Sequence, residues 1–163
     1  MTRTLAARAL ELLGPFEGRV AVLGPHRGRL AAALGARVPL AGADEPAAAA
    51  VLTFLGAGAA AAERHALVAS LGWRLPRGAP VVLVDHNQPR TWARRLLGIV
   101  ALVLRGLGPA RARYPAAREL AALGLEVERL RLVCGERVQL VAARWEQGTR
   151  AGAGELVVPA GSK

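Results

Sequence analysis

Three polar residues, Asp85, His86 and Asn87, follow directly after the apolar run Val81 to Val84. The run is rich in valine and begins after Pro80, which predicts a strand buried on both faces. Polar groups just past such a strand lie at the carboxyl edge of a parallel sheet, where open α/β folds bind ligands. We therefore predict that Asp85, His86, Asn87 and the nearby Arg90 face a substrate.

His86 is the one candidate for a catalytic base, because a neutral imidazole titrates near working pH. It is not expected to form a dyad with Asp85, since adjacent residues of a strand point to opposite sides of the sheet. Asn87 also fits a second role as a helix cap, with Pro89 in the first helical turn. No nucleophile triad is predicted, because Cys134 falls in an expected hairpin turn.

A second candidate site is the turn "GPHRG", Gly24 to Gly28, between an expected strand and an expected helix. Free backbone N–H groups and the helix dipole at such a turn favour an anionic or carboxylate group. Arg27 and Arg29 would add charge-assisted hydrogen bonds. The alternative is a tight turn that only joins two elements.

The elements that must position these residues alternate between helix and strand. Helices are predicted for 2–13, 29–34, 59–71, 91–105 and 116–123, and strands for 20–23, 48–55 and 81–84, with a short strand possible at 37–41. Two further strands around Cys134-Gly135-Glu136 indicate an antiparallel hairpin. The fold class is therefore α/β, with a mostly parallel sheet and a C-terminal antiparallel β-hairpin. We expect one domain over 1–145 and a Gly-rich tail over 146–163.

Composition narrows the class of protein. The chain has 163 residues, 53% of them hydrophobic, and a formal charge of +10. Lys163 is the only lysine, so 21 of the 22 basic residues are arginines, a bias typical of GC-rich genomes.

The single cysteine, Cys134, excludes an intramolecular disulfide and a cysteine-rich zinc site, and no metal is predicted. The apolar stretches 46–62 and 96–104 are too short or too weakly apolar to span a bilayer. We expect a cytoplasmic protein.

The order of elements and several local strings resemble class I S-adenosylmethionine-dependent methyltransferases. "VAVLGPHRGRLAAAL" takes the place of the family's first strand and glycine turn, "LPRGAPVVLVDHN" that of its fifth strand, and "ELAALGLEVERLRLVCGERVQLVAARW" that of its last helix and closing hairpin. The resemblance implies a Rossmann-like fold, S-adenosylmethionine as cofactor and an unidentified methyl acceptor. It implies the following cofactor-binding residues: Leu23, Gly24, Pro25, His26, Gly28, Asp44 (on the ribose, with Glu45 as the other choice), Phe54 and Leu55.

The chain departs from the family pattern in three places. Val22 replaces the acid of the first strand, His26 replaces the middle glycine, and about one βα unit is lacking between "GADEP" and "AAAAVLTFLGAG". A side chain at position 26 would fill or cap the space that glycine leaves open for a ligand. Two readings therefore stay open: a methyltransferase, and a non-catalytic binding or scaffold protein that keeps the fold without the cofactor.

A third reading comes from an acid-free zone between His86 and Arg118. It contains seven arginines, with Trp92 and Tyr114 among them: Arg90, Arg94, Arg95, Arg105, Arg111, Arg113 and Arg118. Such a zone could bind an acidic partner such as RNA, an anionic membrane surface or an acidic carrier protein. The third reading is therefore an arginine-rich nucleic-acid-binding protein with no catalytic role. The alternative is a solvated face that reflects codon bias.

Overall fold

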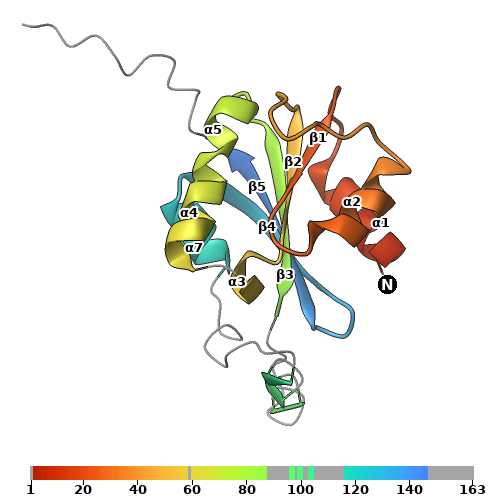
Figure 1. Cartoon of the computed structure of the whole chain (residues 1–163), viewed down its shortest axis with the longest axis vertical. Helices are drawn as coiled ribbons and strands as arrows, with labels where there is room; N and C mark the ends of the chain where they lie inside the picture. Colours follow the sequence, from red (N-terminus) through yellow and green to blue (C-terminus); the bar gives the residue numbers. More distant parts are fainter. Residues whose placement is uncertain are drawn as a thin grey trace, which may run out of the picture.

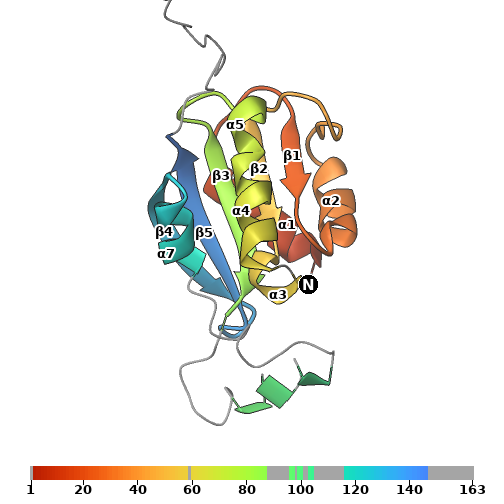
Figure 2. The ribbon, with the colours of Figure 1, turned by 60° about the vertical axis from the view of Figure 1, so that its left-hand side comes forward.

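The computed structural model describes residues 2–58, 60–87, 96–97, 99–100, 103–104 and 116–146. Its centre is a five-stranded sheet in the order β1-β2-β3-β5-β4. The strands are β1 (Val20–Leu23), β2 (Ala49–Thr53), β3 (Pro80–His86), β4 (Leu125–Val133) and β5 (Val138–Trp145). β1, β2 and β3 pair in parallel, whereas β5 pairs antiparallel with both β3 and β4. Figure 2 shows the five strands side by side. The predicted parallel sheet with a closing hairpin is confirmed.

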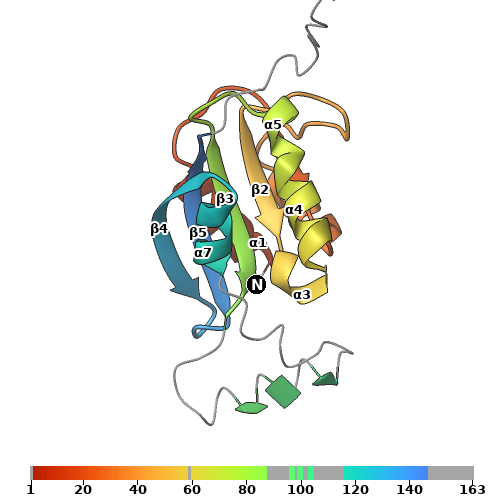
Figure 3. The ribbon, with the colours of Figure 1, turned by 90° about the vertical axis from the view of Figure 1, so that its left-hand side faces the viewer.

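Helices cover both faces of the sheet (Figure 1). On one side lie α1 (Thr2–Leu13) and α2 (Arg27–Gly35). On the other lie α4 (Ala61–Ala69), α5 (Leu71–Arg74) and α7 (Ala116–Ala122), with the single turn α3 (Leu55–Gly58) below the end of β2 (Figure 3). Each side has its own apolar cluster, because alternate residues of the buried strands point to opposite faces. The cluster under α1 contains Leu5, Ala6, Ala9 and Leu13 of that helix.

The central strands are buried on both faces, as their apolar runs predict. Every residue of β2 is buried, and so are Val81 to Asp85 of β3. Burial of five successive residues requires cover on both faces of the strand, which the two helical layers supply here. The strand predicted at 48–55 is shorter in the structure, and the helix predicted at 59–71 is divided into α4 and α5.

The connection between α2 and β2 contains no further helix or extended strand over residues 36–48. The possible strand at 37–41 is reduced to one bridge, in which Leu40 pairs in parallel with Val20. Val20 donates to the carbonyl of Pro39, and Ala41 donates to the carbonyl of Val20. The chain then turns back to start β2, with Ala48 bonded to the carbonyl of Arg19. A βα unit is therefore lacking at this position, as the sequence predicts.

Within the described residues, no helix has the length and apolar character needed to cross a bilayer. Of the helix predicted at 91–105, the structure describes only residues 96–97, 99–100 and 103–104. Of the seven arginines in the acid-free zone, it describes only Arg118. The tail predicted from 146 lies outside them too, except for Glu146, whose carboxylate accepts a bond from Arg77.

Candidate functional site

The carboxyl ends of β1, β2 and β3 meet at one edge of the sheet because the three strands are parallel. We call this region, made of residues 23–28, 53–56 and 85–87, the carboxyl edge. It brings together most of the predicted site residues: Leu23, Gly24, Pro25, His26, Gly28, Phe54, Leu55, Asp85, His86 and Asn87. Arg90, predicted to face a substrate, lies outside the described residues.

The turn after β1 is packed directly onto the end of β2. Gly24 has a φ of 114°, and a Cβ at this position would clash with the backbone carbonyl oxygen of Thr53. The buried hydroxyl of Thr53 lies 3.0 Å from the carbonyl oxygen of Pro25 and 3.3 Å from that of Leu23, and it can donate to either. Thr53 therefore fixes the turn against β2. Sequence reasoning missed this residue, although a hydroxyl at the end of a buried apolar strand must find a partner.

Two residues at the carboxyl edge have a left-handed backbone. His26 has a φ of 59° and immediately precedes α2, and Phe54 has a φ of 51° and immediately precedes α3. Such conformations are unfavourable for residues other than glycine and persist only where the surrounding structure enforces them. His26 thus keeps a backbone conformation that glycine adopts easily, while its side chain is exposed to solvent. Its imidazole makes no capping bond to α2.

Gly28 differs from Gly24 in its surroundings. It lies in the first turn of α2, where a Cβ would meet no atom within 4 Å. The space beside Gly28 is therefore open, whereas the space beside Gly24 is filled by protein. A ligand that lies against this turn can approach at Gly28.

Asp85 holds the turn after β2 in place. Its side chain accepts bonds from the backbone N–H of Gly56 at 2.7 Å and from its own neighbour His86 at 2.7 Å. Burial raises the pKa of this carboxyl from 3.8 to about 6, against the opposing effect of the two N–H groups. The Asp85 side chain is thus directed at backbone and not at the imidazole of His86, as the alternation along a strand predicts.

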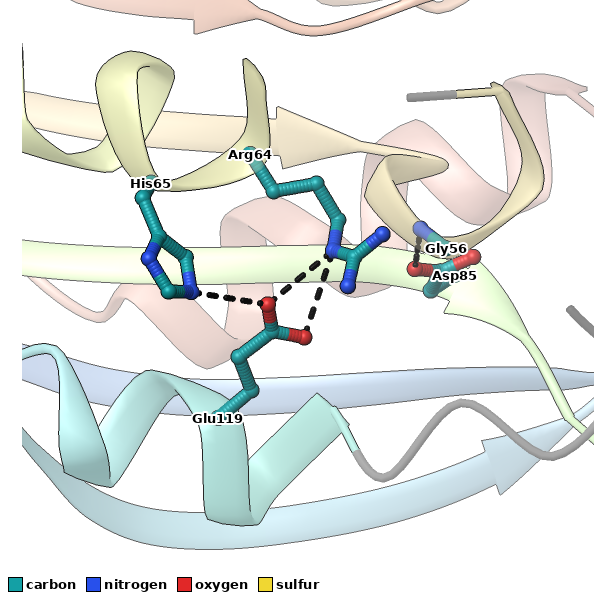
Figure 4. A network of polar contacts seen from close by, with 5 residues as sticks. All are labelled: Gly56, Arg64, His65, Asp85 and Glu119. Carbon is teal, nitrogen blue, oxygen red and sulfur yellow. Dashed lines mark hydrogen bonds and ion pairs between the residues drawn. The ribbon is translucent and has the colours of Figure 1, made fainter. Parts of the chain in front are cut away.

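A charged network extends from Asp85 to the helices on the same face (Figure 4). Arg64 of α4 donates to both carboxylate oxygens of Glu119 on α7, at 3.0 and 3.3 Å, and His65 lies 3.3 Å from the same carboxylate. Figure 4 shows the Arg64 guanidinium between the carboxylates of Glu119 and Asp85. The Arg64 charge lowers the pKa of Asp85 and the Glu119 charge raises it. No sequence pattern indicates this network, because 55 residues separate Arg64 from Glu119.

His86 and Asn87 have different surroundings. The ring of His86 packs against Phe54, with the ring centroids 4.8 Å apart. Asn87 donates from its side chain to the carbonyl of Glu136, at 2.8 Å, and so ties the end of β3 to the β4–β5 turn. The cap role predicted for Asn87 involves residues 88–90, which lie outside the described residues.

Two of the predicted residues are placed in ways that do not fit a direct role. Leu55 is fully buried in the core, so its side chain is not available to a ligand. Asp44 is not brought to the carboxyl edge. Its neighbour Glu45 forms an ion pair with Arg19, which precedes β1, so this loop lies at the amino ends of the strands. The ribose contact of Asp44 therefore stays a prediction, and its loop lies beside Arg19 at the start of β1.

Comparison with known proteins identifies the fold. No protein-family model matches the sequence, and no curated protein matches it. Solved structures do match. The pyocyanin biosynthetic protein PhzM is 15% identical to this chain, with a TM-score of 0.66, and the match covers 88% of this chain and 54% of PhzM. An O-methyltransferase family protein from Burkholderia thailandensis matches at 13% identity with a TM-score of 0.60. This match covers 90% of this chain and 57% of the other protein. The chain has the methyltransferase fold.

A third match is the N-methyltransferase NodS from Bradyrhizobium japonicum WM9, solved in complex with S-adenosylhomocysteine. It is 12% identical, with a TM-score of 0.52 over 87% of this chain and 86% of that one. The chain spans little more than half of the first two matched structures. The resemblance seen in the sequence is therefore confirmed for the fold.

Proposed function

We propose that the chain is an S-adenosylmethionine-dependent methyltransferase whose acceptor is unidentified. The observation that carries the proposal is the carboxyl edge, where the β1–α2 and β2–α3 turns lie side by side with His26 and Phe54 in strained conformations. Strain of this kind gathers at ligand sites. Matched structures that carry out methyl transfer or hold S-adenosylhomocysteine share the fold.

The residues of the carboxyl edge suggest distinct roles in this proposal. The open face at Gly28, together with Pro25 and His26, would bind the cofactor, and Phe54 would contact it from the end of β2. The cofactor supplies an activated methyl group. Transfer needs mainly alignment with the acceptor atom, which positioning can provide without a dedicated base. Asp85 would keep the β2–α3 turn in place, and His86 stays the candidate base for an acceptor that must lose a proton.

The second candidate is a binding protein that keeps the fold without the cofactor. The position of Asp44 favours it, because the ion pair between its neighbour Glu45 and Arg19 keeps this loop at the start of β1 and away from the carboxyl edge. A titration with S-adenosylhomocysteine separates the two. A single site with an affinity in about the micromolar range supports the methyltransferase. No heat at high protein concentration overturns it and leaves the binding protein.

A variant at Gly28 tests the location of the site. Gly24 is unsuitable, because any side chain there disturbs the backbone of Thr53. We expect Gly28→Phe to fold normally, since the space around Gly28 is open, and to weaken S-adenosylhomocysteine binding by about tenfold or more. Ala32→Phe is the matched control, since Ala32 is an exposed residue one turn further along α2. Equal binding by both variants would place the cofactor elsewhere.

A further inference from the structure

A cavity of about 200 Å³ lies along the outer side of β1, where the missing βα unit would otherwise stand. It is lined by Val22 and Leu23 of β1, Arg27 and Ala31 of α2, residues 40–43 and Arg74 of α5. Two of the lining residues are arginines, and none carries a carboxylate. The cavity adjoins the carboxyl edge through Leu23 and Arg27.

Arg74 is the unusual member of this lining. The residue is only 8% exposed, and its Nε is buried without a hydrogen-bond partner among the described residues. Its Nη1 donates a long hydrogen bond of 3.4 Å to the carbonyl of Gly42, and its guanidinium lies over the ring of Trp73, 4.4 Å from the ring centroid. No carboxylate within the described part of the chain forms an ion pair with it. A buried charge without a counter-charge is costly.

Glu45, whose carboxylate lies beside Gly42, does not compensate this charge. Glu45 accepts a bond from the N–H of Gly42 at 2.9 Å and pairs with Arg19, and these two contacts lower its pKa. It does not line the cavity. Arg27 and Arg74 thus line a small, partly open cavity, and no residue of its lining supplies a negative charge.

We propose that this cavity binds a small phosphate-type anion, either free phosphate or the phosphate group of a small metabolite. The anion would accept charge-assisted hydrogen bonds from the guanidinium groups of Arg74 and Arg27, the two cationic residues of the lining. The volume suits a group of this size and not a nucleotide. S-adenosylmethionine carries a net positive charge, so two arginines without an acid do not select for it. The proposal is therefore independent of methyl transfer.

Calorimetric titration tests the proposed anion site. The intact chain is titrated with sodium phosphate at low ionic strength, and with sodium chloride at matched ionic strength as the control. We expect saturable one-site binding of phosphate only. Arg74→Met should weaken binding by about tenfold or more, because a charge-assisted hydrogen bond is lost. Arg27→Gln should weaken it less, and Arg29→Gln, an exposed arginine of α2 outside the lining, should leave it unchanged. A parallel titration with glycerol 3-phosphate identifies the source: tighter binding indicates a metabolite, and weaker binding indicates the free ion.

Two results would overturn the proposal. One is the absence of saturable binding of either phosphate compound. The other is an equal loss in Arg27→Gln and Arg29→Gln, which would indicate attraction to net charge alone. Folding of Arg74→Met is checked by thermal denaturation without phosphate. It should be as stable as the natural chain or more stable, since an uncompensated buried charge is removed. Should Arg74→Met fail to fold, the exposed Arg27 still decides between the outcomes.

Discussion

Asp85 shows how one buried side chain can make stability depend on pH. Its pKa in the folded chain is about 6, above the ordinary value of 3.8. Between these two pH values the folded chain binds more protons at this group than the unfolded chain does. The contribution of Asp85 to stability is therefore complete below about pH 4 and is lost as the pH rises through 6. A shift of this size corresponds to about 3 kcal/mol.

Asp85→Asn is expected to remove this dependence. The amide oxygen can still accept from Gly56, while the amide nitrogen faces the N–H of His86 and loses one bond. The variant should therefore be less stable than the natural chain at pH 4, with the deficit becoming smaller or reversing at pH 7. Urea denaturation of both proteins at the two pH values measures the difference. Parallel pH profiles would contradict the assignment of the raised pKa to Asp85.

The sequence could predict the residue types at the carboxyl edge but not their partners. The sequence predicts a strand followed by Asp85, His86 and Asn87, and it predicts the glycine turn from Gly24 to Gly28. The bond from Gly56 to Asp85 spans 29 residues, and the bond from Thr53 to Pro25 spans 28. Such pairings depend on strand order and register, which a local pattern does not contain.

Among the elements, the turn between β1 and α2 has two glycines with opposite requirements. Gly24 needs both its positive φ and the absence of a Cβ, whereas Gly28 needs neither. We expect Gly24→Ala to lower the free energy of unfolding by roughly 2–4 kcal/mol, because it combines backbone strain with a clash against Thr53. Gly28→Ala should be neutral or should raise stability by up to about 1 kcal/mol, since alanine favours the helix.

Chemical denaturation of these two alanine variants measures the contrast. The structure of the turn would be disproved if Gly24→Ala were as stable as Gly28→Ala. The comparison uses the same substitution at positions four residues apart, so differences in expression or in the unfolded chain largely cancel.

Most element positions follow from the sequence because burial on two faces leaves continuous apolar runs. β1 is found at the residues predicted, and α1 and α7 within one residue of their predicted ends. The loop containing Asp44 could not be placed in this way. The sequence indicates that a βα unit is lacking, but only the single bridge between Val20 and Leu40 shows that the chain returns to the amino ends of the strands.

At the scale of the whole molecule, Trp145 joins the last strand to the helical layer. It is 2% exposed and packs in the same apolar cluster as Leu71 and Leu75 of the α5 region. Its backbone also exchanges bonds with residues 78 and 79, before β3. The tryptophan therefore links β5, α5 and the start of β3 in one contact region.

Trp145→Ala is expected to cost about 3–5 kcal/mol of the free energy of unfolding, the range for deleting a large buried aromatic side chain. That is a large fraction of the roughly 5–15 kcal/mol that stabilises a typical domain. Trp73→Ala is the control, since Trp73 is 48% exposed and should cost about 1 kcal/mol or less. Guanidinium titrations followed by circular dichroism measure both. Similar losses in the two variants would contradict the packing described for Trp145.

The position of β5 between β3 and β4 has a consequence for the order of folding during synthesis. β3 is complete at residue 86, yet its second edge is paired only by residues 138–145. While the ribosome adds the intervening chain, that edge presents unpaired N–H and C=O groups on a strand of seven residues. The sheet can close only after the β4–β5 hairpin has emerged, so the nascent chain passes through an interval in which β3 is open to pairing with other strands.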